Sequence, residues 1–363
     1  MRILHAADLH LDSAFAALPA EKARQRRREI RALPDRLAAL VKEEQIDLVL
    51  LPGDLFDSER VFPETLDQLK DGLGKMKCPV FIAPGNHDPC VRSSPYVTEE
   101  WPENVHIFRS EDLTGVHLEK MNCTVYGAAF TDAHRRSEVL EGFSAPKDGK
   151  LHLLCLHGAV DEPGSEYGNL SRQQIAGSGL DYLALGHVHR YSGAQQYSGS
   201  TWAYCGCPEG RGFDETDDRG AVIADVETGC VTLRFVPLCR RRYRVLRVDV
   251  TDCTPGEALE QVLPATAADD ICRVVFTGEV GEEGLDLRAI EADWASRCYE
   301  LQLRDETRPA ETLWQRAGED SLRGLFLKEL HRRYEASMDE KEREIILSAV
   351  RFGLAAIDGR DLG

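Results

Sequence analysis

Short apolar runs that stop at polar residues recur along the first half of the chain. The clearest is Leu48–Leu51, which is wholly apolar and ends at Pro52 and Gly53, with Asp54 directly after them. A run of this length bounded by turn residues is typical of a strand buried on both faces of a parallel sheet. The pattern predicts five such strands, each followed by Asp, Asn or His; the other four are Arg2–Ala7, Pro79–Ala83, Leu151–Leu156 and Tyr182–Leu185.

Helical patterns lie between the first of these strands. A charged helix is predicted near Glu21 to Glu44, interrupted at Pro34, and a second helix near Pro63 to Met76. This β-α-β alternation implies a parallel sheet layered between helices. From Gln195 to Leu238 we expect antiparallel strands that complete the second half of a sandwich. Shorter strands are predicted at Val105–Phe108, Val116–Glu119, Cys123–Tyr126, Ala221–Val226 and Val231–Val236.

The pattern changes near Arg240 to Arg244, which predicts a domain boundary. The residues from Tyr243 to Leu303 alternate strands with helices and suggest a small β-α-β-α-β unit. Pro309 to Ile357 reads as helical with two apolar stripes, which either pack on the chain's own core or form a partner surface. The predicted domains are 1–239, 240–305 and 306–363.

The polar residues after the buried strands are candidates for a functional site. Ligands of open α/β sheets bind outside the carboxyl ends of the strands. A lone Asp there is more often a turn or helix cap, and a lone His is usually a core residue, but five repetitions favour a site. Residues two apart in extended chain point the same way, so Asp8 with His10, and His187 with His189, can each aim two ligands at one point. The pooled candidates are Asp8, His10, Asp54, Asn86, His157, His187 and His189.

The ligand types indicate two divalent metal ions. Seven ligands exceed what one four-coordinate zinc uses, and none is a thiolate. Oxygen and imidazole donors together suit manganese, iron or zinc, and Asp54 can bridge because a carboxylate has two oxygens. Two ions roughly 3.5 to 4 Å apart hold the attacking and leaving oxygens of a displacement at phosphorus and lower the pKa of water. The expected reaction is phosphoester hydrolysis.

The motifs at these positions resemble those of calcineurin-like metallophosphoesterases. Asp8-Leu9-His10, Gly53-Asp54-Leu55-Phe56-Asp57, Gly85-Asn86-His87-Asp88, His157-Gly158 and Gly186-His187-Val188-His189 occur in the family's order. The Leu-Phe-Asp after Gly-Asp and the stretch Cys207 to Glu215 are similar to SbcD-type DNA repair exonucleases, and Asp8-Leu9-His10-Leu11-Asp12-Ser13 is similar to the YhaO-like branch of that group. The resemblance implies an α/β fold, a four-layered α/β/β/α sandwich with a small α+β capping domain and C-terminal helices. It also implies a manganese-dependent nuclease, a homodimer, and an SbcC-like coiled-coil ATPase that receives the C-terminal helices.

The resemblance also assigns roles to individual residues. One ion would be held by Asp8, His10, Asp54 and His189, and the other by Asp54, Asn86, His157 and His187. His87 resembles the family's catalytic histidine, which contacts the scissile phosphate and helps protonate the leaving oxygen. Asp88 either orients His87 or a ligand, or caps a helix. Asp57 and Asp12 are further candidates for supporting the ligands, with ordinary turn carboxylates as the alternative.

The charge and composition of the chain bear on which substrate it binds and in which compartment it works. The net charge of −18 argues against a general nucleic-acid binder, since phosphates are contacted by Lys and Arg. Two basic clusters stand out, Arg24 to Arg31 and Arg240 to Arg244, and each is either part of a DNA path or a solvated helix face or domain edge. The 11 cysteines are odd in number and scattered, which favours reduced thiols in a cytoplasmic protein. No apolar run approaches the ~20 residues of a membrane span, and Met1 leads directly into the first strand, so we expect neither membrane association nor a signal peptide.

Three functions follow from these observations. The first is a dinuclear-metal-dependent DNA exonuclease or endonuclease in DNA repair, working with an SbcC-like ATPase. The second is a metallophosphoesterase acting on small nucleotides or other phosphoesters, for which the same ligands would serve. The third is a metal-bearing scaffold that holds the ATPase, against which stands the complete set of proposed ligands.

Overall fold

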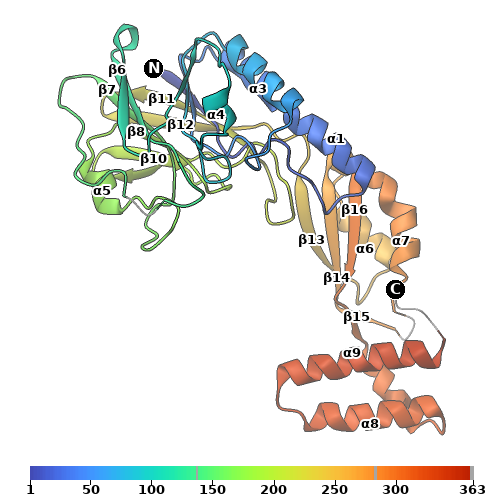
Figure 1. Ribbon diagram of the computed structural model, residues 1–363. Coiled ribbons are helices and arrows are strands. Elements are labelled where there is room, and N and C mark those ends of the chain that lie inside the picture. The colour runs from blue at the N-terminus through green and yellow to red at the C-terminus, as the bar shows by residue number, and fades with distance from the viewer. Residues whose placement is uncertain (136–137, 282–283, 360–363) are drawn as a thin grey trace. The chain divides into compact units, whose positions relative to one another are not determined.

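Residues 1–242 form one unit built on two six-stranded mixed sheets in the computed structural model (Figure 1), which describes residues 1–135, 138–281 and 284–359. The first sheet has the strand order β12-β11-β1-β2-β3-β4. Strands β1 to β4 run parallel, whereas β11 and β12 extend the sheet in antiparallel fashion. The bounds are β1 (Arg2–His5), β2 (Leu48–Leu51), β3 (Val80–Ile82), β4 (Val105–Ile107), β11 (Gly220–Glu227) and β12 (Cys230–Pro237).

The second sheet has the order β5-β6-β7-β8-β10-β9, with β6, β7, β8 and β10 parallel and the edge strands β5 and β9 antiparallel to their neighbours. Its strands are β5 (Thr114–Leu118), β6 (Cys123–Gly127), β7 (Leu151–His157), β8 (Tyr182–Gly186), β9 (Gln195–Tyr197) and β10 (Ser200–Tyr204).

The prediction of antiparallel strands in the second sheet from Gln195 to Leu238 was wrong in two respects. Strand β10 runs parallel to β8, and the hairpin β11-β12 joins the first sheet beside β1. Five successive residues of β11, from Gly220 to Ala224, are buried, because this strand is covered on both faces: Ala224 joins the cluster between the sheets, and Val222 packs with Ala7 and Cys205. An apolar run shows that a strand is buried but does not identify the strands beside it.

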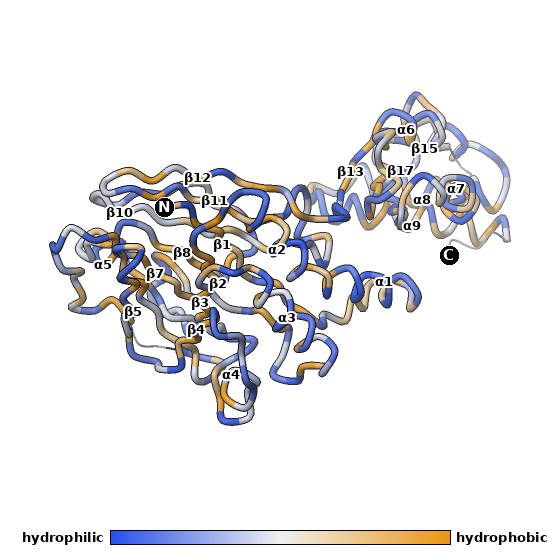
Figure 2. Tube along the Cα trace, turned by 90° about the horizontal axis from the view of Figure 1, so that it is seen from above, coloured by the Kyte–Doolittle hydropathy of each residue, from blue (hydrophilic) through white to orange (hydrophobic). Residues whose placement is uncertain are grey.

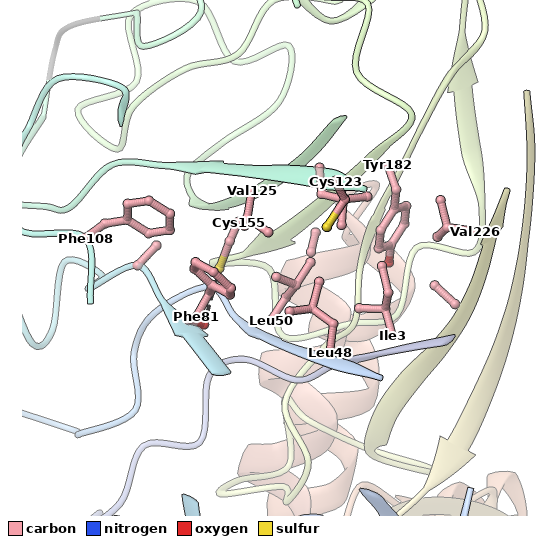
Figure 3. Packing of buried hydrophobic residues seen from close by; sticks show 14 residues of the cluster. Ile3, Leu48, Leu50, Phe81, Phe108, Cys123, Val125, Cys155, Tyr182 and Val226 are labelled. Atoms are coloured by element: carbon pink, nitrogen blue, oxygen red, sulfur yellow. Dashed lines mark hydrogen bonds between the residues drawn. The ribbon is translucent and has the colours of Figure 1, made fainter. Parts of the chain in front are cut away.

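The two sheets pack face to face. Their inner faces share one buried apolar cluster, with Ile3, Leu48 and Phe81 from the first sheet against Val125 and Cys155 from the second (Figure 3). Figure 2 shows the layers in order, with α5 outside the second sheet and α2 and α3 outside the first, and the strands carry much of the apolar colour. The first unit is therefore a mixed α/β sandwich with two sheets between helices.

The helices of the first unit are α1 (Ala20–Arg31), α2 (Leu33–Glu43), α3 (Pro63–Lys75), α4 (Pro95–Thr98) and α5 (Arg172–Gly177), with a short 3₁₀ helix at Glu119–Met121. The predicted interruption near Pro34 is confirmed: α1 ends at Arg31 and Pro34 lies in the first turn of α2. Proline is tolerated there because the first N–H groups of a helix have no partner within it. On α3, Gly72 lets α2 approach closely, since a Cβ at this position would lie 2.5 Å from Pro34 Cβ.

Residues from Tyr243 onward form a separate compact unit. It contains a parallel sheet of β13 (Tyr243–Asp249), β14 (Ile271–Thr277) and β16 (Glu300–Asp305), connected by α6 (Pro255–Val262) and α7 (Leu287–Trp294). The predicted β-α-β-α-β order is confirmed. A capping box between Thr254 and Glu257 starts α6. Smaller elements are β15 (Glu279–Val280), β17 (Arg308–Pro309) and 3₁₀ helices at Ala267–Asp269 and Ala295–Arg297.

The C-terminal segment is a helical hairpin. A 3₁₀ helix (Glu311–Gly318) precedes α8 (Leu322–Ala336) and α9 (Glu340–Ile357). Val350 and Leu354 of the second predicted stripe join Leu327 in the core of the hairpin, and Phe326 and Leu330 of the first stripe pack against it. The exposed stripe residues include Leu322 and Leu325 of the first stripe and Ile345 and Phe352 of the second. The helices among the described residues are all too short or too polar to span a membrane.

Candidate metal centre

The carboxyl ends of β1, β2 and β3 and of β7 and β8 bring the predicted ligands together. In the first group, Nε2 of His10 lies 3.1 Å from Nε2 of His189 and 3.8 Å from Oδ2 of Asp54. Oδ1 of Asp8 lies 3.9 Å from Nε2 of His189. One donor atom each from Asp8, His10 and His189 falls within 4.8 Å of the other two, a separation that one ion can span.

A second group adjoins the first. Nε2 of His157 lies 3.5 Å from Oδ2 of Asp54 and 3.0 Å from Oδ1 of Asn86. The same Asp54 oxygen therefore faces both groups, whereas the expected bridge used one oxygen for each. The ring centroid of His187 lies 5.3 Å from that of His157. The backbone N–H of His187 donates to the Asp8 carboxylate. All seven predicted ligands thus lie in one cluster.

The backbone turns that aim these side chains differ from the expected geometry. Strand β1 ends at His5, and Asp8 and His10 lie beyond it with φ of 53° and 44°. Asp54 and His187 also have positive φ, 51° and 108°. The convergence was predicted, but the reason offered for it, alternation along an extended strand, was wrong. Non-glycine residues with positive φ are costly and collect at functional sites.

Hydrogen bonds between loops maintain these turns. The N–H of Asp8 donates to the Gly53 carbonyl and that of His10 to the Asp54 carbonyl, each at 3.0 Å. Gly85 leaves no room for a side chain, because a Cβ there would lie 2.2 Å from Oδ1 of Asp54. The loops after β1, β2 and β3 therefore form one interlocked support for the ligands.

Asp88 supports the loop that carries Asp54. Its buried carboxylate accepts the backbone N–H groups of Asp54, Leu55, Phe56 and Gly85 at 2.7–3.2 Å and the Tyr96 hydroxyl at 2.6 Å. Burial, and then the charge of Asp54, raises the pKa of Asp88 to about 7. The alternative interpretation of Asp88 as a helix cap was wrong, since Ser94 caps the following helix, α4.

His87 lies exposed at the rim of the cluster. Its backbone N–H donates to Oδ1 of Asp54 at 3.0 Å, and its ring nitrogen Nδ1 lies 3.2 Å from the Asp57 carbonyl. The His87 and His10 rings meet edge to face with centroids 4.9 Å apart. A hollow of about 500 Å³, lined partly by His87 and Arg60, opens beside it.

The electrostatics of the cluster suit divalent cations. Burial, and then the nearby charge of Asp54, raises the pKa of Asp8 well above its usual range. Burial lowers the pKa of His10 and of His187 to about 4, so both rings are neutral at pH 7 and can donate a lone pair. Buried carboxylates of like charge are costly unless a positive charge compensates them. The donors present therefore fit a site for two divalent ions.

Two carboxylates lie beside the outer nitrogens of the histidines in the first group. Oε1 of Glu215 lies 2.6 Å from Nδ1 of His189, and Oδ1 of Asp57 lies 3.2 Å from Nδ1 of His10. Although burial opposes its ionisation, the hydrogen bond with His189 and the charge of Arg211 lower the pKa of Glu215 to about 2. Glu215 was not predicted to be a site residue; its only signal was its place in the stretch that carries the family resemblance. Asp12 instead accepts from Thr65 and Arg31, away from the ligands.

The basic clusters are partly internal. Arg26 is fully buried and pairs with Glu29 at 2.7 Å and with Glu209 at 2.8 Å. Arg241 from the second cluster is also buried and pairs with Glu29, and Arg36 pairs with Glu209. The interpretation of these clusters as solvated faces was therefore wrong for Arg26 and Arg241, and neither side chain is available to DNA.

Comparison with known proteins identifies relatives of the chain. The profile of the calcineurin-like phosphoesterase family matches residues 1–191. The chain is 29% identical to the uncharacterized metallophosphoesterase YhaO of Bacillus subtilis (strain 168), over 85% of this chain and 82% of that protein. It is 27% identical to the DNA double-strand break repair protein Mre11 of Methanopyrus kandleri, over 100% and 85%. It is 31% identical to the SbcD subunit of the nuclease SbcCD of Bacillus subtilis, over 56% and 62%.

Proposed function

Because the chain belongs to the calcineurin-like phosphoesterase family and is a metal-dependent phosphoesterase, we propose that it cleaves phosphodiester bonds in DNA as a repair nuclease. The observation that carries the proposal is the cluster of the seven predicted ligands with the exposed imidazole of His87 at its rim. Two relatives with names that denote a DNA repair protein and a nuclease support the substrate class. The first unit is a mixed α/β sandwich, which is the fold class expected for a member of this family.

In this proposal the ligands divide as the motifs suggest. Asp8, His10, Asp54 and His189 hold one ion, and Asp54, Asn86, His157 and His187 hold the other. Bound divalent ions at this position would polarise the phosphate and activate a water molecule. Manganese is our first choice, with iron and zinc as alternatives that the same donors accept.

His87 supplies the proton in this proposal. Its Nδ1 donates to the Asp57 carbonyl, because a carbonyl oxygen only accepts, and this leaves Nε2 for the substrate. A protonated imidazole in this position can contact the scissile phosphate and give its proton to the leaving oxygen. Asp88 acts through the backbone around Asp54 and is a positioning residue rather than a catalytic one.

Two hollows beside the cluster favour a polymeric substrate. One, of about 670 Å³, is lined by His187, His189 and Arg190 together with the loop of residues 214–219. The other, of about 500 Å³, adjoins His87 and includes Arg60. Arg60 and Arg190 are both exposed, so each can contact a backbone phosphate on its own side of the scissile bond. The second candidate is hydrolysis of small nucleotides or other phosphoesters, because a net charge of −18 opposes a polyanionic substrate more strongly than a small anion.

The exposed part of the C-terminal hairpin suits a partner. Leu322, Leu325, Ile345 and Phe352 are each at least 60% exposed on α8 and α9. We propose that these side chains dock on the coiled coil of an SbcC-like ATPase, consistent with a relative named as one subunit of SbcCD. The same proposal includes a capping role for residues 240–305 and a separate C-terminal domain at 306–363. It also includes a homodimer and a cytoplasmic location.

The test measures nucleotide release from end-labelled linear double-stranded DNA with manganese, magnesium or chelator. We expect manganese-dependent digestion by the wild type and loss of digestion in His87→Ala, which keeps every proposed ligand. His117→Ala, which changes an exposed histidine on the edge strand β5, is the matched control and should digest DNA normally. Hydrolysis of a small phosphodiester without DNA digestion, in the presence of the ATPase partner, would favour the second candidate function.

A further inference from the structure

Arg211 joins the two carboxylates that lie beside the histidines of the first group. Its Nη1 donates to Oδ1 of Asp57 at 2.9 Å and its Nη2 to Oε1 of Glu215 at 3.0 Å. Its backbone N–H also donates to the other Glu215 oxygen at 2.7 Å. A planar guanidinium can form both ion pairs at once in a fixed geometry.

Each of these carboxylates lies beside one predicted metal ligand. Asp57 faces Nδ1 of His10, and Glu215 faces Nδ1 of His189. Glu215 forms a hydrogen bond with Nδ1 of His189, which leaves the Nε2 lone pair for an ion and fixes the direction of that ring. Asp57 acts on His10 by its charge, since its contact with Nδ1 lacks hydrogen-bond geometry. The two Nε2 atoms are accordingly aimed at one region, 3.1 Å apart. Arg211 thus connects the surroundings of His10 and His189 through Asp57 and Glu215, and its Nη2 also lies 3.2 Å from Nδ1 of His189.

The arrangement serves only one of the two ligand groups. His157, in the second group, has its Nδ1 held by the Pro52 carbonyl at 3.0 Å. The His187 ring packs against Tyr167, with centroids 4.9 Å apart. Neither support involves Arg211, so a change at Arg211 should act on the ion held by Asp8, His10 and His189.

The loop that carries Arg211 is itself anchored. Glu209, two residues earlier, is buried and accepts from Arg26 at 2.8 Å and from Arg36 at 2.7 Å. These ion pairs tie the loop to α1 and α2. The Arg211 backbone therefore has a fixed position from which its side chain can hold both acids.

We propose that Arg211 is a positioning residue that sets the affinity of the first metal group through Asp57 and Glu215. This inference rests on the metal ligands of the proposed function but not on DNA as the substrate. Without the guanidinium, the two acids lose their shared partner and are no longer held beside the two imidazoles. Loss of such outer partners lowers metal affinity by about 10- to 100-fold.

The experiment titrates Mn²⁺ into chelator-treated full-length protein by calorimetry. The wild type should bind two ions, whereas Arg211→Ala should bind one with unchanged affinity and the other about 10- to 100-fold more weakly. Arg211→Lys keeps the charge but lacks the planar guanidinium that contacts both acids, so its loss of metal affinity should lie between those of the wild type and Arg211→Ala. Arg234→Ala removes an exposed ion pair with Glu44 and is the matched control, expected to bind as the wild type does. Electron paramagnetic resonance should show the coupled spectrum of a manganese pair in the wild type and an isolated ion in Arg211→Ala at the same loading.

The outcomes separate this inference from the nuclease proposal. Unchanged affinity for both ions in Arg211→Ala would overturn it, as would an equal loss at both sites. Circular dichroism of the metal-free variants identifies misfolding. If Arg211→Ala misfolds, Glu215→Gln, which hardly changes the side-chain volume, must show the same selective loss of affinity for the ion of the first group. A wild type that binds both ions but leaves DNA intact would overturn the substrate class alone.

Discussion

His5 should make the stability of the first unit depend on pH in a defined direction. The ring is fully buried on β1, with Nδ1 2.8 Å from the Tyr182 hydroxyl and Nε2 3.1 Å from the Leu185 carbonyl. A carbonyl oxygen only accepts, so Nε2 carries the hydrogen and Nδ1 accepts from Tyr182. Both nitrogens of the neutral ring are satisfied, and burial lowers the pKa of His5 to about 3.

The magnitude follows from the two pKa values. The unfolded chain takes up a proton on His5 below about pH 6.5, whereas the folded chain does so only near pH 3. The stability contributed by the neutral ring is therefore fully present above about pH 6.5 and is lost as the pH falls from there toward 3. Each pH unit is worth about 1.4 kcal/mol, so the loss at pH 5 is about 2 kcal/mol.

The variant His5→Gln should remove this dependence, because glutamine does not titrate and its amide can still donate to the Leu185 carbonyl. Urea unfolding followed by circular dichroism near pH 7.5 and near pH 5, with chelator present, gives the free energy of unfolding for both proteins. The wild type should lose about 2 kcal/mol more than the variant, since all other titrating groups are common to both. Equal losses in the two proteins would refute the reasoning.

Two further predictions concern the supports of the site. Arg26→Met removes one charge from the buried network and leaves Glu209 with fewer partners, so the free energy of unfolding in urea should fall by about 3–5 kcal/mol; a change below about 1 kcal/mol would show that the network relaxes without cost. Gly85→Ala places a Cβ against Oδ1 of Asp54, so Mn²⁺ binding by calorimetry should weaken at both groups while circular dichroism is unchanged. Wild-type binding of both ions in that variant would contradict the assignment of Asp54 to both groups.

Much of the first unit could be predicted because its signals are local. Each buried strand is a continuous apolar run, and the end of each run locates the polar residues that follow it. Parallel strands end at one edge of a sheet, so Asp54 and Asn86 had to approach one another once β2 and β3 were recognised. The sequence therefore predicts the ligands as a set but not the directions of their side chains.

Features that depend on distant partners could not be predicted. Arg26 and Glu209 are 183 residues apart, and Arg241 and Glu29 are 212 apart, so no local pattern distinguishes these buried arginines from exposed ones. Strand β11 has an apolar pattern that suits either sheet, and only its pairing with β1 placed it in the first.

The sequence by itself determined which polar residues follow the buried strands, because short apolar runs mark the strands and the polar residues come directly after those runs. Only the tertiary structure decided how the ligands are aimed. Asp8, His10 and Asp54 owe their directions to left-handed backbone turns, which the loops after neighbouring strands maintain by hydrogen bonds. It also revealed Arg211 and Glu215 beside His189, since the energy of an ion pair depends on separation in space and not along the chain.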